Sequence, residues 1–223
     1  MARINKLRTS PKTVSIIVDG ETESWYFQLM QTHEKYAKLS VKPEIPQRKS
    51  LQKQYESVVE NAKHYDALIW VVDFDTVLKE DRERKKGTLS SITQFKQYLN
   101  TIEKHQPNVK VVVNQPCFEF WLLLHFVDTS RAFNNCEEAQ KLLSKYIEGY
   151  EKTEKFYKNP QNDLYKRLKD LQVTAIKNAQ KLGIFDADEP ANSKAEIYQI
   201  ITCLTKSEIH EFISCLTGKN KTA

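Results

Sequence analysis

The stretch Ala-Leu-Ile-Trp-Val-Val-Asp-Phe-Asp, from Ala67 to Asp75, places six consecutive apolar residues directly before two carboxylates. A short apolar run of this length, rich in β-branched residues, is typical of a strand that is buried on both faces of a parallel sheet. Comparable runs occur at Val14–Val18, around Ser40–Ile45 and at Val109–Val113. The sequence therefore predicts four strands in its first half.

Segments with helical spacing separate these strands. Apolar residues recur every three or four positions within 25–30, 51–62 and 92–102. Because parallel strands require crossover connections, this alternation predicts an α/β fold: a doubly wound, mostly parallel four-stranded sheet with helices on both faces. Pro43 and Pro46 flank the second strand, which suits only an edge position.

The pattern changes after residue 127. Strand-like runs give way to segments rich in Lys and Glu with helical spacing, such as 139–146, 165–182 and 197–216. We therefore expect an α/β core at residues 1–127 and a helical C-terminal region at residues 128–223 that packs on the core.

Composition sets wide limits on function. The chain has 34 Lys and Arg against 29 Asp and Glu, a net charge of +5, which permits a phosphate-bearing partner without requiring one. The first residues are basic and polar, with no apolar segment of a signal peptide, and no run approaches the roughly 18 apolar residues that span a bilayer. We expect a cytoplasmic protein with no membrane partner.

The four cysteines form no CxxC pair and have no histidine at zinc-ligand spacing. This pattern favours neither a zinc site nor a redox motif. We expect buried free thiols at Cys117, Cys136, Cys203 and Cys215.

Acidic residues follow three of the predicted strands. Open parallel sheets bind ligands beyond the carboxyl ends of their strands. In an extended backbone, Asp73 and Asp75 would point to the same side, and Asp19 follows the first strand. We predict that Asp19, Asp73 and Asp75 hold Mg²⁺ (or Mn²⁺), because this ion prefers a few carboxylates completed by water and phosphate. The alternative is that these acids only cap helices, form turns or lie in solvated loops.

Two glutamates complete the set of candidate catalytic residues, which are Asp19, Glu23 and Glu119. Gly20 fits a tight strand-to-helix turn, which brings Glu23 close to the first strand end. Glu119 follows Pro116 near the expected start of a helix, where the helix dipole favours an anion. The alternative for Glu23 is that it only caps its helix.

A basic run follows the Asp73-Phe-Asp75 motif. Its cations Arg82, Arg84, Lys85 and Lys86 are predicted to contact phosphates that enter the carboxylate site. The alternative is a solvated loop.

Three motifs carry a resemblance to a known family. They are Ile17-Val-Asp19-Gly-Glu-Thr-Glu23 with Tyr26-Phe27, Val71-Val-Asp73-Phe-Asp75, and Asn114-Gln-Pro-Cys-Phe-Glu119-Phe-Trp-Leu-Leu-Leu-His-Phe126. Together they resemble the RloB family, an abortive-infection-associated group with a Toprim-like core. The similarity extends through residues 175–204, including 192–198, and the motif that starts at Asn114 is its most specific part.

The resemblance implies a fold and an activity. Toprim domains keep a Glu after the first strand, as acid/base or ligand, and an Asp-x-Asp pair that binds Mg²⁺. Asp73 and Asp75 match that pair, whereas Asp19, shorter by one methylene, stands where most relatives have Glu. The implied function is a Mg²⁺-dependent nuclease, or a related phosphodiester-processing effector, that acts on DNA or RNA in defence against phage. A partner ATPase is often associated with this family.

Two other functions remain open at this point. The Asp19 departure favours a Toprim-like scaffold that binds nucleic acid or a partner without catalysis. The stretch from Val71 to Leu78 also fits the first motif of haloacid-dehalogenase-like phosphohydrolases, in which the first Asp is a nucleophile. That class begins its sheet with this motif, however, whereas here two predicted strands precede it.

Overall fold

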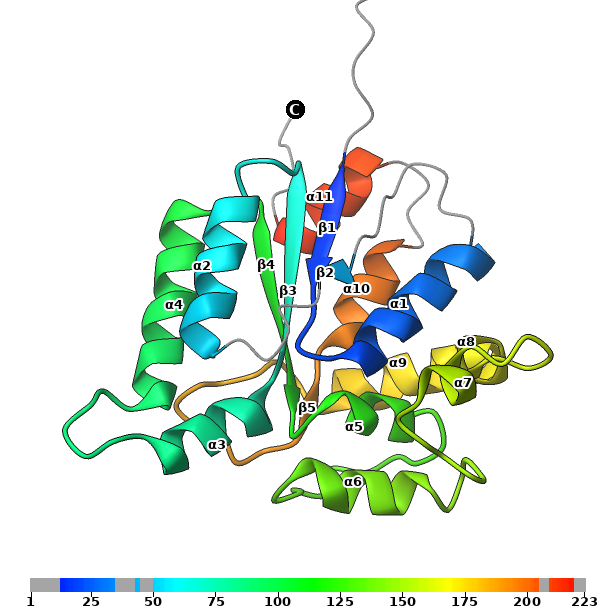
Figure 1. The fold of residues 1–223 in the computed structure, drawn as a ribbon. Helices are drawn as coiled ribbons and strands as arrows, with labels where there is room; N and C mark the ends of the chain where they lie inside the picture. The colour runs from blue at the N-terminus through cyan, green and yellow to red at the C-terminus, as the bar shows by residue number, and fades with distance from the viewer. Residues whose placement is uncertain (1–12, 35–42, 45–49, 205–208, 219–223) are drawn as a thin grey trace, which may run out of the picture.

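The computed structural model describes residues 13–34, 43–44, 50–204 and 209–218 (Figure 1). Its centre is a five-stranded sheet with the strand order β2-β1-β3-β4-β5. The strands are β1 (Val14–Ile17), β2 (Pro43–Glu44), β3 (Ala67–Asp73), β4 (Val109–Gln115) and β5 (Lys194–Ala195). The first four are parallel, and β5 runs antiparallel to β4.

The predicted α/β class and the four mostly parallel strands are confirmed. The second strand occupies an edge, as its prolines indicated, although residues 40–42 and 45 of the predicted run lie outside the described residues. The fifth strand was not predicted. Two residues are too few to produce a readable pattern, and β5 forms only because residues 194 and 195 pair with Gln115 and Asn114.

Strand β3 organises the core because its side chains alternate between the two faces of the sheet. Ala67, Ile69 and Val71 belong to one cluster of buried apolar residues, whereas Leu68, Trp70 and Val72 belong to another. All seven residues of β3 are buried. The continuous apolar run in the sequence thus follows from a strand with a hydrophobic core on each face.

The helices form a layer on each side of the sheet (Figure 1). Helices α2 and α4 cover one face, and α1, α5, α9 and α10 lie on the other. The helices of the first part are α1 (Glu21–Glu34), α2 (Leu51–Asn61), α3 (Phe74–Glu83), α4 (Ser91–His105) and α5 (Phe118–Leu123). This is the doubly wound arrangement that the sequence predicts.

The described residues from 128 onward form several helices and the short strand β5. The elements are α6 (Cys136–Leu143), α7 (Glu154–Tyr157), α8 (Leu164–Leu168), the 3₁₀ turn η1 (Lys169–Leu171), α9 (Gln172–Lys181), α10 (Ile197–Leu204) and α11 (Ile209–Thr217). Leu143, Tyr165 and Ile200 share one buried cluster with Val14 and Ile69 of the sheet. The apolar core is therefore continuous from the sheet into these helices.

Helix α3 was not predicted from the sequence. It begins at Phe74, directly after Asp73, so Asp75 lies in the first turn of a helix and not in an extended strand. The expected extended geometry of the Asp73-Phe-Asp75 motif is therefore wrong. The segment has only two buried residues, Phe74 and Val77. Two apolar positions among charged residues are too few to indicate a helical period.

The expectation of free thiols is also wrong for this structure. Disulfide bonds join Cys117 to Cys136 and Cys203 to Cys215. Both pairs bring together residues far outside CxxC spacing, 19 and 12 positions apart. Only the tertiary fold makes these pairings visible.

Glu196 provides a test of how the C-terminal region is attached to the sheet. Its buried carboxylate accepts hydrogen bonds from the backbone N–H groups of Val113 (2.8 Å) and Phe185 (2.9 Å). Glu196→Ala leaves both donors without this acceptor, so we expect the free energy of unfolding to fall by about 2–4 kcal/mol in urea titrations. The exposed Glu189→Ala is the matched control and should change it by less than about 0.5 kcal/mol. Equal effects of the two substitutions would contradict this account.

Candidate functional site

The order of the strands places the candidate site. The chain runs from β1 outward to β2, crosses back past β1 to β3, and continues in the other direction to β4. The order of the strands therefore reverses between β1 and β3. In open α/β sheets, ligands bind at such a switch point, beyond the carboxyl ends of the strands. Asp19 follows β1, Asp73 ends β3 and Glu119 follows β4, so three adjacent strands bring their acids to this edge.

Asp19 is held by a chain of hydrogen bonds from the sheet. Its Oδ1 accepts a hydrogen bond from the Gln54 side chain (2.7 Å), and Gln54 in turn accepts one from the indole N–H of Trp70 (3.1 Å). Burial raises the pKa of Asp19 to about 6, with a further contribution from the Asp75 charge, while the Gln54 hydrogen bond opposes the shift. Asp19 therefore has a defined orientation, and no ion pair joins it to a Lys or Arg among residues 13–34, 43–44, 50–204 and 209–218.

Asp73 is buried at the end of β3. Its Oδ2 accepts a hydrogen bond from the backbone N–H of Phe118 (3.1 Å), and its Oδ1 lies 3.3 Å from the Asn114 amide nitrogen. Burial raises the pKa of Asp73 well above its usual range, and the charges of Glu23 and Asp19 raise it further. These neutral donors orient the carboxylate without neutralising its charge.

Asp75 faces the same region from the first turn of α3. Its backbone N–H donates to the carbonyl oxygen of Pro116 (3.0 Å), and its carboxylate accepts a hydrogen bond from the backbone N–H of Cys136. Burial raises the pKa of Asp75, while the nearby Lys152 charge opposes that shift. The two aspartates of the motif are thus close, although a strand end and a helix start position them.

Glu23 points into the site from α1, where only 2% of its surface is exposed. Its Oε2 accepts a hydrogen bond from the Thr22 hydroxyl (2.8 Å). A Cβ atom at Gly20 would lie 3.0 Å from the same oxygen, so only glycine leaves this space open. Burial raises the pKa of Glu23 to about 7, and the charges of Asp19 and Glu119 contribute. Glu23 is therefore a member of the cluster and not merely a helix cap.

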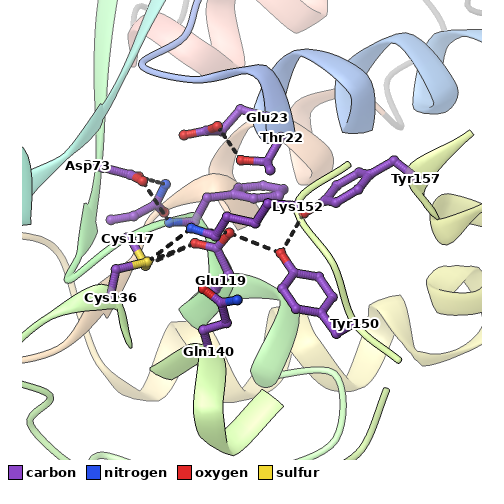
Figure 2. Close-up of polar contacts among 12 residues, drawn as sticks. Thr22, Glu23, Asp73, Cys117, Glu119, Cys136, Gln140, Tyr150, Lys152 and Tyr157 are labelled. Carbon is purple, nitrogen blue, oxygen red and sulfur yellow. Dashed lines mark hydrogen bonds and ion pairs between the residues drawn. A yellow bond between two sulfur atoms is a disulfide. The ribbon is translucent and has the colours of Figure 1, made fainter. Parts of the chain in front are cut away.

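Glu119 lies in the first turn of α5, as predicted, and only 1% of its surface is exposed. Figure 2 shows its contacts: Oε1 pairs with the Lys152 ammonium (2.8 Å) and accepts a hydrogen bond from the Tyr150 hydroxyl (3.0 Å). Tyr150 also shares a hydrogen bond of 2.7 Å with Tyr157. Burial and the neighbouring Tyr157 and Glu119 raise the pKa of Tyr150, so its hydroxyl keeps the proton that it donates.

Lys152 is a member of the site that sequence reasoning missed. Burial alone would lower its pKa, but the charges of Glu119, Asp73 and Glu23 outweigh that effect and raise it, so the ammonium stays charged. Lys152, Tyr150 and Tyr157 come from the segment between α6 and the end of α7, which bears no motif. Chain folding alone carries them to the carboxyl edge of the sheet, so the sequence offers no signal for them.

A pocket of about 280 Å³ opens among these residues. Its walls are formed by Asp19, Gly20, Glu21, Thr22, Glu23, Trp25, Asp73 and Lys152. Burial is the largest cause of the upward pKa shifts of Asp19, Glu23, Asp73 and Asp75, and the charges of neighbouring carboxylates add to it. A positive charge close to these groups would oppose both effects. The site therefore favours an added cation.

The type of cation follows from the donors. Asp19, Asp73 and Asp75 offer hard oxygen ligands, which suit Mg²⁺ or Mn²⁺. Among the described residues, only Cys117, Glu119 and Cys136 gather three ligand atoms within 4.8 Å of one another. The aspartates are arranged more openly, which fits an ion that keeps several waters and takes only one or two carboxylates directly.

The predicted phosphate contacts lie elsewhere. Arg82 is in the last turn of α3, and Arg84, Lys85 and Lys86 follow in the α3–α4 connection, all exposed or partly exposed. None of the four lines the acidic pocket. Arg84 instead pairs with Asp81 (3.4 Å) and donates to the carbonyl oxygen of Thr88 (3.1 Å). In Figure 1 this end of α3 points away from α1 and α5.

The fold and site define an α/β protein with an acidic pocket at the switch point of a parallel sheet. Comparison with known proteins then identifies the family: the sequence profile described as RloB-like protein matches residues 14–204. The chain belongs to the RloB-like family. No curated protein and no solved structure matches the chain. No helix among the described residues has the length and apolar character needed to cross a membrane.

The raised pKa values predict how stability depends on pH. The folded protein holds protons on Asp19 and Glu23 up to pH values of about 6 and 7, whereas unfolded carboxylates ionise near pH 4. Their contribution to stability is therefore complete below about pH 4 and is lost as the pH rises through 6 and 7. For Glu23 alone we expect a loss of roughly 2–3 kcal/mol between pH 5 and pH 8 in urea titrations with chelator present.

Glu23→Gln should flatten this pH dependence, because the amide does not ionise. The exposed Glu60→Gln is the control and should leave the slope as in the wild type. An unchanged slope in Glu23→Gln would show that Glu23 does not titrate in this range.

Proposed function

We propose that this chain is a Mg²⁺-dependent (or Mn²⁺-dependent) nuclease. The observation that carries the proposal is that carboxylates from the ends of the adjacent strands β1 and β3 line one pocket together with Lys152, which pairs with Glu119 at the start of α5. Phosphodiester cleavage requires a group that binds phosphate, a source of nucleophilic water and a proton carrier. Oxygen ligands for a metal ion, an ammonium and a carboxyl group with a raised pKa can supply these functions.

Asp19, Asp73 and Asp75 would hold the metal ion. When bound, Mg²⁺ supplies charge neutralisation on the phosphate and a more acidic water. The hydrogen bonds from Gln54 and from the Phe118 N–H keep two of these carboxylates oriented before the ion arrives. This arrangement is consistent with the Toprim-like reading of the motif, which remains part of the proposal.

Glu23 is the residue best suited to carry a proton. A carboxyl group with a pKa of about 7 is near the point where acid and base forms are equally available at neutral pH. Glu23 also bears on the departure at Asp19, which is one methylene shorter than the Glu that the resemblance implies. Because Glu23 lines the same pocket, it supports a catalytic role for the site despite the shorter residue.

Lys152 is placed to stabilise negative charge on a phosphate. Its ammonium lines the pocket with the side chain 40% exposed, so a substrate can reach it. Glu119 and Tyr150 then have a positioning role, because Glu119 pairs with Lys152 and accepts the Tyr150 hydrogen bond. In this proposal Glu119 acts through Lys152 and does not contact the scissile bond.

The substrate would be DNA or RNA, and the setting would be phage defence in the cytoplasm, with a partner ATPase as the family resemblance implies. Helix α3 connects the two predicted parts of the interface, because Asp75 lies in its first turn and Arg82 in its last turn. Ten residues span about 15 Å. A nucleic-acid backbone that leaves the pocket along α3 would therefore meet Arg82, Arg84, Lys85 and Lys86 a few nucleotides from the cleaved bond.

A non-catalytic scaffold is the second candidate. The observation that favours it is the identity of Asp19 at the position where the resemblance implies Glu. In that case the pocket would bind Mg²⁺ and nucleic acid without cleavage.

Cleavage is the first test of the nuclease proposal. Purified chain should cleave at least one member of a panel of DNA and total RNA when Mg²⁺ or Mn²⁺ is present, as followed on denaturing gels. Asp73→Ala should lower the rate at least about a hundredfold, because it removes a metal ligand. The exposed Asp170→Ala is the matched control and should keep wild-type activity. Cleavage that survives in Asp73→Ala would reject this site.

Thermal unfolding tests metal binding separately from catalysis. At a Mg²⁺ concentration a hundred times the dissociation constant, binding adds about 2.7 kcal/mol of stability, which for a chain of this size raises the melting temperature by roughly 5–10 °C. The rise should be smaller at pH 5 than at pH 8, since protons compete for Asp19 and Asp73. Asp73→Ala should lose it and Asp170→Ala should keep it. A full rise with no cleavage, even with the partner ATPase added, would favour the scaffold.

A further inference from the structure

A second group of potential metal ligands lies on the other side of Glu119. The Sγ atoms of Cys117 and Cys136 lie 3.1 and 2.9 Å from Glu119 Oε2, and the three ligand atoms all lie within 4.8 Å of one another. In the structure the two sulfurs form a disulfide bond. Neither sulfur then carries a proton or a free charge, so the buried Oε2 faces two atoms that cannot donate to it.

The two oxygens of Glu119 have separate partners. Oε1 faces Lys152 and Tyr150, whereas Oε2 faces only the sulfurs in the contacts described above. Figure 2 shows this division, with the sulfurs on one side of the carboxylate and the tyrosine on the other. Oε2 can therefore bind a further group without releasing Lys152.

The surroundings favour thiolates once the disulfide is reduced. Cys136 is the first residue of α6, whose N-terminus stabilises negative charge, and Lys152 Nζ lies 3.5 Å from Cys136 Sγ. Two thiolates and the Glu119 carboxylate together carry three negative charges. A divalent cation adds two positive charges and so offsets the charge of the two thiolates.

We propose that the reduced chain binds Zn²⁺, or another thiophilic divalent cation, through Cys117, Cys136 and Glu119. Reduction by a dithiol breaks the sulfur–sulfur bond, transfers two electrons and two protons to the cysteines, and oxidises the dithiol to its own disulfide. Metal binding then displaces the two thiol protons. The fourth position of the tetrahedron is left for water.

The geometry requires small movements of the carboxylate and a larger separation of the two sulfurs. With Zn–S bonds of about 2.3 Å and a Zn–O bond of about 2.0 Å, tetrahedral ligands lie about 3.5–3.8 Å apart. The two contacts between sulfur and Oε2 therefore need to lengthen by roughly 0.5 Å, and the sulfurs separate once they are no longer bonded. The site is distinct from the aspartate site in its donors: soft sulfur selects Zn²⁺, whereas carboxylates alone suit Mg²⁺.

The test uses Co²⁺ as a spectroscopic probe on the full chain, reduced with a phosphine that is removed before the titration. Wild-type protein should develop the thiolate-to-cobalt charge-transfer absorption in the near ultraviolet at one equivalent of Co²⁺, and Zn²⁺ should abolish it by displacement. Glu119→Gln should weaken Co²⁺ binding by about tenfold or more, since it replaces a charged ligand with a neutral amide. The oxidised wild type should give no band.

The second cysteine pair provides the matched control. Cys117→Ser with Cys136→Ser should lose the band, whereas Cys203→Ser with Cys215→Ser should keep it, and circular dichroism checks that each variant folds. Asp73→Ala should also keep the band, so the result is independent of the nuclease proposal. The absence of a band in reduced wild type, or a band that survives loss of Cys117 and Cys136, would overturn the proposal.

Discussion

The closeness of several carboxylates at one poorly hydrated edge of the sheet is the constraint on which the rest of the structure depends. Each acid is oriented by a neutral donor, such as the Gln54 amide at Asp19 and the Phe118 N–H at Asp73, and these donors do not remove the repulsion. Lys152 relieves only part of it. An arrangement of this kind costs stability, and a folded protein retains such strain where it supports function.

The rigid and the adjustable parts of the site come from different parts of the chain. The acids lie at the ends of β1 and β3 and at the starts of α3 and α5, all anchored in the two apolar cores. Lys152 lies instead in the connection between α6 and α7, with its side chain 40% exposed. The fixed acids define where positive charge is needed, and the partly exposed lysine supplies part of it while paired with Glu119.

The sequence predicts most of what the backbone alone determines. Apolar runs predicted β1 and β3 because both strands are buried along their whole length, and the position of acids after strands pointed to Asp19, Asp73 and Glu119. Helix α3 was not predicted because its two buried residues are outnumbered by charged residues, which leaves no clear apolar period. The contacts of Lys152 and the two disulfide pairings were not predicted for another reason. Their partners are distant in sequence, and no local pattern indicates which segments the fold brings together.

Gly20 affects the space available to the Glu23 side chain as well as the turn in which it lies. Because a Cβ atom there would approach Glu23 Oε2 to 3.0 Å, positions 20 and 23 form one unit in which each residue limits the other. Among related chains, a side chain at position 20 should therefore occur together with a shorter residue at position 23, or with one whose end turns away from position 20. The residue at position 20 would then distinguish family members that have a glutamate inside the pocket from those that do not.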